Sequence, residues 1–294
     1  MRPETKQLLK NIAIGLGVFS LFALLLYGVW HGTRVSALTI DEVVVSGGET
    51  ISHETVAVDV SVLLEGDYAR FIPRRFAWTY PENEIMTKLL EVDRVKDPVV
   101  QRKGKQLLVT LAEYEPVALW CDDSDSERCV FLDDTGYGFA VAPDLTGGAF
   151  TRFVRIGEGA VTSELFTDPA DFLLLQELVT LFEEFGWPVT TVEFDTARDA
   201  FVYLAGGGEL KVSLLQTPIE TTDNLQVVLS TEQYRHIQPG NFEYIDLRFG
   251  NKVFVNEFGA PEEEIEDEVD ISDVAEEVLE TSNAAPSEDG AAIE

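Results

Sequence analysis

Twenty consecutive residues near the N-terminus, Asn11–Trp30, carry no charged side chain. As an α-helix at about 1.5 Å per residue, this stretch covers roughly 30 Å, the thickness of the hydrocarbon core of a bilayer. Three basic residues and one acidic residue precede it. Because basic flanks stay in the cytoplasm, we predict a cytoplasmic tail over residues 1–10, a single transmembrane helix over residues 11–30 and an extracytoplasmic body.

A cleaved secretory signal is the alternative interpretation of the same stretch. Val35, Ser36 and Ala37 form an acceptable cleavage site after an apolar run. The run is longer than the roughly 7–15 apolar residues of a signal peptide, and His31 and Arg34 crowd the cleavage site. Both observations favour an uncleaved anchor in the cytoplasmic (inner) membrane.

The formal net charge of −32 is concentrated in the exported part of the chain. Such a surface repels phosphate backbones and therefore excludes nucleic acid as a partner. After residue 259 the chain has fourteen acidic residues and no Lys or Arg. Because a charged segment with few large apolar residues cannot offset its ordering entropy, residues 258–294 are predicted to be a disordered acidic tail. A weak amphipathic pattern there leaves open a helix that forms on binding a partner.

Cys121 and Cys129 are the two cysteines of the chain, and they flank a polar loop of seven residues. The apolar residues on either side of the loop are typical of two short strands. A hairpin would place the two thiols across from each other, so we predict a disulfide in an oxidising exported compartment. A free pair or a metal site is the alternative.

Residues 38–115 are predicted to form a first domain with the element order β-α-α-β-β. A β-branched run closed by glycines begins it. Helices are expected at Ser52–Leu64, with Ser52 as the cap, and after Pro81. A strand is the alternative for the first of these segments, because Val56, Val58, Val60 and Val62 alternate. Two strands follow at Val95–Arg102 and Gln106–Tyr114, joined by a turn with a glycine.

Residues 116–257 are predicted to form a second, mostly antiparallel β domain that contains two helices, which gives the chain an α+β fold. The stretch Asp168–Gly186 has an acidic cap, an early proline and a wide apolar face, and Pro218–Gln233 indicates a second helix. Phe242–Leu247 and Lys252–Asn256 are expected to close the domain as a hairpin.

The sequence contains none of the catalytic motifs that short patterns can indicate, such as GxSxG, HExxH or GxGxxG. His31, His53 and His236 have no cysteine or carboxylate at the spacing of a metal site. We therefore expect no enzymatic activity, no metal, no cofactor and no small-molecule substrate. An anchored hydrolase with an unrecognised site remains a third possibility.

Several short segments, in their order along the chain, resemble the FtsQ/DivIB cell-division proteins. Residues 95–118 read VKDPVVQRKGKQLLVTLAEYEPVA and, together with the preceding strand and Ser-capped helix, look like the POTRA domain of that family. Glu113–Ala118 is similar to its E-R-x-P-V-A segment, and Tyr244–Phe249 is similar to its closing I-D-L-R-Y strand. Tyr114 departs from the family's arginine, and the cluster of Arg70, Arg74 and Arg75 is unusual.

This resemblance implies a non-enzymatic scaffold at the division septum, which binds FtsB/FtsL-type partners outside the membrane. The family holds its partner by strand addition near the end of the β domain, and an unpaired edge of the last hairpin would allow this. The partner-binding residues implied by the resemblance are Arg248, Phe249, Gly250, Asn251, Lys252, Val253 and Phe254. Packing within the hairpin is the alternative role of Phe249 and Phe254. A POTRA-containing module that handles exported polypeptides in assembly or secretion is the alternative function.

Overall fold

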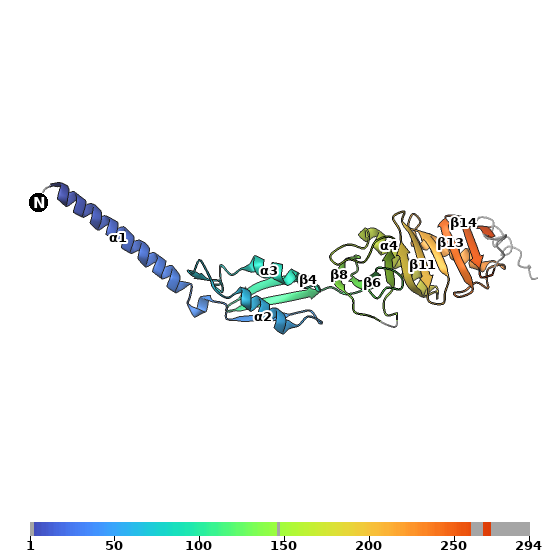
Figure 1. Cartoon of the computed structure of the whole chain (residues 1–294), viewed down its shortest axis with the longest axis horizontal. Coiled ribbons are helices and arrows are strands. Elements are labelled where there is room, and N and C mark those ends of the chain that lie inside the picture. Colours follow the sequence, from blue (N-terminus) through green and yellow to red (C-terminus); the bar gives the residue numbers. More distant parts are fainter. Residues whose placement is uncertain (1–2, 146–147, 260–266, 272–294) are drawn as a thin grey trace, which may run out of the picture. The chain divides into compact units, whose positions relative to one another are not determined.

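The computed structural model describes residues 3–145, 148–259 and 267–271. Their helices and strands confirm the predicted α+β class. The chain divides into two compact units, with the boundary after Tyr114 (Figure 1).

Helix α1, Pro3–Gly32, contains the whole predicted transmembrane stretch (Figure 1). Its segment Gln7–Gly32 is long and apolar enough to cross a membrane, and none of the residues in its most apolar window is buried within the protein. Arg34 follows the helix and donates hydrogen bonds to the carbonyl oxygens of Trp30 (3.1 Å) and Phe71 (2.8 Å). The C-terminal end of the apolar helix is therefore bonded to the first unit.

The first unit has the predicted order β-α-α-β-β, with a two-stranded hairpin inserted between its two helices. Strands β1 and β5 pair in parallel, and β5 and β4 pair antiparallel, so β5 is the central strand. The inserted hairpin, β2–β3, has strands of two residues each, which is too short for a periodic pattern to reveal. The elements are β1 (Glu42–Ser46), α2 (His53–Leu63), β2 (Asp67–Tyr68), β3 (Ile72–Pro73), α3 (Glu82–Leu90), β4 (Val95–Lys103) and β5 (Gln106–Glu113).

The two helices and the sheet of the first unit enclose one apolar core. Val60 of α2, Ile85 of α3 and Leu107 and Val109 of β5 are all fully buried in it. Ser52 caps α2, as predicted, because its side chain accepts a hydrogen bond from the backbone N–H of Thr55. The alternating valines of α2 therefore form a helix, and the ones outside the core are exposed.

Glu113, at the end of β5, holds the turn that follows β1. Its carboxylate accepts hydrogen bonds from the backbone N–H groups of Glu49 (2.7 Å) and Thr50 (3.0 Å) and from the Thr50 hydroxyl. Arg94 lies 3.0 Å from the same carboxylate. Burial alone would raise the pKa of Glu113, but the hydrogen bonds from Thr50 and Glu49, with Arg94, lower it below its usual value.

The second unit is built on one mixed sheet with the order β15-β14-β13-β12-β11-β10-β9-β6-β7-β8. Among the described strands most neighbours pair antiparallel, as predicted, and three pairs are parallel: β12–β13, β10–β9 and β6–β9. The strands are β6 (Ala118–Cys121), β7 (Cys129–Leu132), β8 (Gly138–Val141), β9 (Arg152–Arg155), β10 (Val189–Phe194), β11 (Asp199–Leu204), β12 (Glu209–Ser213), β13 (Phe242–Phe249), β14 (Lys252–Glu257) and β15 (Asp267–Asp270).

The two predicted helices of this unit are α4, Pro169–Glu184, and α5, Pro218–Ser230. The Asp168 side chain caps α4 by accepting a hydrogen bond from the N–H of Ala170 (2.9 Å). Helix α5 begins with a capping box, in which Thr217 and Glu220 each bond the backbone of the other. The apolar faces of both helices pack with the sheet into a core that extends from β6 to β14.

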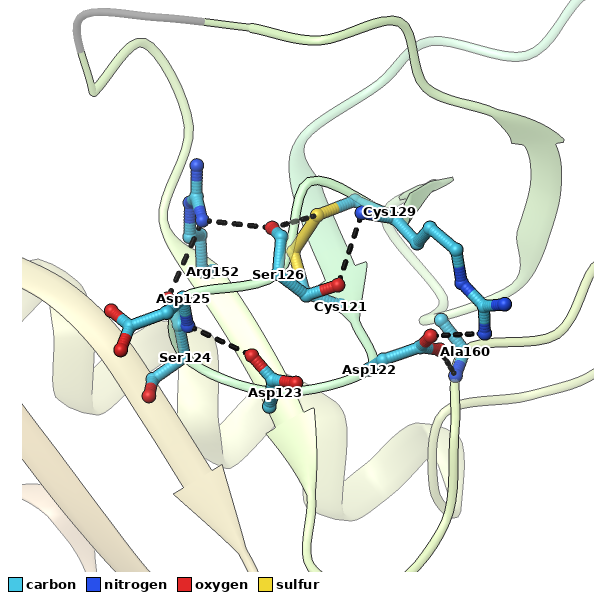
Figure 2. Close-up of a disulfide and its surroundings, with 10 residues drawn as sticks. Cys121, Asp122, Asp123, Ser124, Asp125, Ser126, Cys129, Arg152 and Ala160 are labelled. Carbon is cyan, nitrogen blue, oxygen red and sulfur yellow. Dashed lines mark hydrogen bonds and ion pairs between the residues drawn. A yellow bond between two sulfur atoms is a disulfide. The ribbon is translucent and has the colours of Figure 1, made fainter.

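A disulfide joins Cys121 and Cys129, which lie directly opposite each other on β6 and β7, as the spacing predicts (Figure 2). The loop between them is held from outside by Arg152, whose guanidinium donates to the carbonyl oxygen of Ser126 (3.1 Å). The Asp122 carboxylate also accepts from the N–H of Ala160 (2.9 Å). The disulfide therefore closes a short loop that β9 and the segment after it also hold.

The prediction of disorder after residue 257 is wrong for part of the acidic tail. Residues Asp267–Asp270 form β15, which pairs antiparallel with β14. Charge composition predicts disorder there, but the edge of β14 supplies backbone partners that composition does not take into account. The rest of the predicted tail after Gly259, residues 260–266 and 272–294, lies outside the described residues.

Candidate functional site

The candidate site is the C-terminal end of the large sheet, where β13, β14 and β15 lie side by side (Figure 1). The predicted partner-binding residues form the end of β13, the turn between β13 and β14, and the first half of β14. The structure thus brings all seven residues, Arg248–Phe254, into one hairpin. They differ in how much of each side chain another molecule could reach.

The turn of this hairpin is held in place by helix α5. Gly250 has a positive φ of 67°, a conformation that favours glycine. The Asn224 side chain donates a hydrogen bond to the Gly250 carbonyl oxygen (2.9 Å). This contact between α5 and the turn holds the position at which β14 begins.

Arg248 is engaged within its own sheet. Its guanidinium donates to both carboxylate oxygens of Asp246, at 2.6–3.2 Å, and to Asp199 on β11 (3.0 Å), so it bridges across β12. Asp246 is only 6% exposed. The hydrogen bonds with Asp246, and then with Asp199, outweigh burial and raise the pKa of Arg248. Arg248 therefore neutralises two partly buried carboxylates, a structural role that the sequence alone did not indicate.

Phe249 and Phe254 contact each other across the hairpin, with an edge-to-face arrangement and 5.5 Å between ring centroids. The alternative role of cross-strand packing is therefore present in the structure. Phe249 nevertheless remains 53% exposed, whereas Phe254 is half-buried. Phe249 is the large apolar side chain of the hairpin that a partner could cover.

The first four residues of β14 alternate between its two faces. Val253 and Val255 are buried in the core, while Lys252 and Phe254 lie on the opposite face. The edge of β14 was expected to be open, and this expectation is wrong. β15 occupies it in the register Lys252↔Asp270, Val253↔Val269 and Val255↔Asp267.

The contacts of the added strand extend into the turn of the hairpin. The N–H of Ile271 donates to the Asn251 carbonyl oxygen (2.8 Å), and the Asn251 side chain donates to the Asp270 carboxylate (3.3 Å). Val269 and Ile271 are partly buried and pack against the core of the second unit. The short acidic segment Asp267–Ile271 is therefore bonded to the predicted partner-binding residues.

A group of polar side chains on neighbouring strands, which no pattern in the sequence indicates, lies beside this site. Burial raises the pKa of Glu209; Lys211 opposes the rise, and the carboxylates of Glu193 and Asp246 add to it. Burial, with the charges of Glu193 and Glu209, raises the pKa of Tyr203 to about 12. These residues come from four neighbouring strands, β10 to β13, so only the register of the sheet brings them together.

No family model matches this chain, and no curated protein matches its sequence. A function must therefore be inferred from the geometry of the sheet end and from the residues that form it. Two properties of that end matter most. It accepts a short strand through its backbone, and it presents Phe249 beside that strand.

Proposed function

We propose that this protein is a non-enzymatic bitopic scaffold of the bacterial division machinery. Helix α1 anchors it in the cytoplasmic membrane with the N-terminus inside, and the body after Gly32 works outside the membrane. The end of the large sheet binds an extracytoplasmic segment of an FtsB/FtsL-type membrane protein. This contact recruits and regulates septal peptidoglycan synthesis.

The observation that carries the proposal is the strand β15 on the edge of β14. A sheet edge that accepts one extended segment through backbone N–H and C=O groups is able to accept another. In this binding mode the backbone supplies affinity, and side chains on alternate positions supply selectivity. Phe249, exposed beside the edge, adds apolar area that a partner would cover.

The element order supports the same proposal. One apolar helix is followed by a small β-α-α-β-β unit and then by a sheet with two helices, as the resemblance to the FtsQ/DivIB family implies. The short motifs of that resemblance lie at the junction of the two units and in β13. The POTRA-like identity of the first unit is part of this proposal.

The experiment compares two glutamate substitutions in dividing cells. Phe249→Glu places a charge on the proposed contact, and Leu173→Glu places one on α4, where Leu173 is 62% exposed. We expect tagged wild-type protein and L173E to concentrate at the septum and to co-purify a single-span membrane protein. F249E should lose that partner while it remains folded, with only the small loss of stability that follows from removing the Phe249–Phe254 contact. Equal capture by F249E and L173E, or a uniform distribution of the wild type around the membrane, would overturn the proposal.

A further inference from the structure

We infer that the edge of β14 is selective for short extended segments with branched apolar residues two positions apart and a carboxylate between them, and that Asp267–Ile271 is its displaceable internal occupant. This inference rests on the proposed function and deepens it. It names the chemistry of the partner segment and says how the chain limits access to its own site.

The apolar part of this selectivity comes from the seats of Val269 and Ile271. Val269 lies opposite Val253, which is fully buried, and both Val269 and Ile271 pack against the core of the unit. Residues two apart on a strand face the same side, so one face of the accepted segment meets the core. A partner segment needs apolar side chains at these two positions.

The polar part comes from the residues that meet Asp270. Asn251 donates a side-chain hydrogen bond to its carboxylate, and Lys252 is its cross-strand neighbour in the register. Opposite charges at directly paired positions stabilise antiparallel strands. Lys252 is also the last basic residue of the chain. An acidic residue between the two apolar ones is therefore matched to this edge.

Strand β15 pairs weakly enough with β14 for another segment to displace it. It has four residues, it is the last strand of the sheet among the described residues, and its apolar side chains are only partly buried. Three of its four residues are acidic in a chain of net charge −32, so self-repulsion weakens its pairing. A segment with the same apolar spacing and fewer charges competes well against it.

Because the occupant is tethered, it reduces the apparent affinity of any competing segment. The apparent dissociation constant of a ligand rises in inverse proportion to the fraction of sites that are open. If the tail covers the edge of β14 about nine-tenths of the time, preventing the tail from binding raises the apparent affinity of the edge for a competing segment about tenfold. The tail thus sets a threshold that a partner must exceed.

The test uses the full chain in detergent micelles and a fluorescent peptide with the sequence of residues 264–274. Val269→Asp/Ile271→Asp in the protein removes the two apolar contacts of the tail without changing β14. Leu173→Asp/Ile219→Asp makes the same charge change at two exposed apolar positions on α4 and α5. We expect V269D/I271D to bind the peptide at least about tenfold more tightly than wild type or L173D/I219D.

Two further variants test the chemistry of the seat. A peptide that itself carries V269D/I271D should not bind, and Lys252→Glu in the V269D/I271D protein should weaken binding of the unmodified peptide several-fold. Equal binding by wild type and V269D/I271D, or binding by neither, would overturn the inference. Amide hydrogen exchange of β13 in each variant verifies that the sheet remains folded.

The outcomes also separate this inference from the proposed function. Peptide binding to V269D/I271D without capture of a septal membrane protein would leave the strand site intact and remove the division role. Capture of the septal partner without any peptide binding would support the division role and overturn the inference about the strand site.

Discussion

Replacing Arg248 tests whether the end of the sheet is held by a charge network or by apolar packing alone. Arg248→Ala removes four hydrogen bonds between the guanidinium and the carboxylates of Asp246 and Asp199. Asp246, 6% exposed, would keep its charge without its principal counter-ion.

The magnitude follows from the burial of the two partners. Breaking a buried ion pair by removing one partner costs about 3–5 kcal/mol. The Arg248 side chain is 26% exposed, so water replaces part of what is lost. We therefore expect R248A to lower the free energy of unfolding of the second unit by about 2–3 kcal/mol.

Two matched variants separate the ion pair from the loss of side-chain volume. Arg235→Ala removes an arginine whose partner, Glu232, is 92% exposed, and should cost less than about 0.5 kcal/mol. Asp246→Asn combined with R248A removes the unpaired charge and should recover about 1 kcal/mol of the loss.

Hydrogen–deuterium exchange followed by mass spectrometry is the suitable assay, because it reports the opening of β11–β13 separately from the first unit. Peptides from β11 and β13 should exchange faster in R248A by the factor that corresponds to 2–3 kcal/mol, roughly 30- to 150-fold. If R248A and R235A exchange alike, the network does not stabilise the sheet and the reasoning fails.

Three further predictions concern stability. Glu113→Gln should destabilise the first unit by about 1–3 kcal/mol in urea titrations; because the folded pKa of Glu113 is lowered, its contribution is present above its usual value of 4.5 and is lost as the pH falls through the folded pKa. Glu209→Gln should stabilise the second unit above pH 4.5, because the folded pKa of Glu209 is raised, and the gain should grow as the pH rises through that pKa. Thermal melts of wild type and E209Q at several pH values measure this gain, and an equal dependence of the two melting temperatures on pH would contradict it. Cys121→Ser/Cys129→Ser opens a loop closed by residues eight positions apart and should cost about 2–3 kcal/mol, whereas an unchanged unfolding midpoint would contradict that role.

Local patterns in the sequence predicted most of the secondary structure. Ser52 and Asp168 cap helices where a side-chain oxygen is needed, and both helices begin one residue later. The glycine of the turn after β4 and the spacing of the two cysteines gave the hairpins of β4–β5 and β6–β7. Signals of this kind lie within a few residues of the element they determine.

Contacts between residues far apart in sequence were not predictable in this way. Arg248 meets Asp199 only because β12 lies between β11 and β13. Nothing in the sequence near Arg248 indicates that partner. The family resemblance implied a partner contact at the same position.

The acidic tail shows the same limit at the candidate site. Val269 and Ile271 alternate with carboxylates, a pattern too weak to outweigh the charge of the segment. The pairing of β15 depends on the backbone edge of β14 and on the core beneath Val253, which are supplied by residues earlier in the chain. Composition predicted that the acidic tail does not fold by itself, but it could not predict that a part of the tail pairs with β14.

The central claim, that the edge of β14 binds an extended segment of another membrane protein, is tested most directly by photo-crosslinking from β14 in dividing cells. Lys252 and Phe254 lie two residues apart on one face of the strand, so a crosslinker at either position reads the register of whatever lies beside it. We expect crosslinks from the two positions to map two residues apart within one segment of a single-span division protein. Crosslinks confined to the chain's own Asp267–Ile271, or scattered over unrelated proteins, would contradict the account.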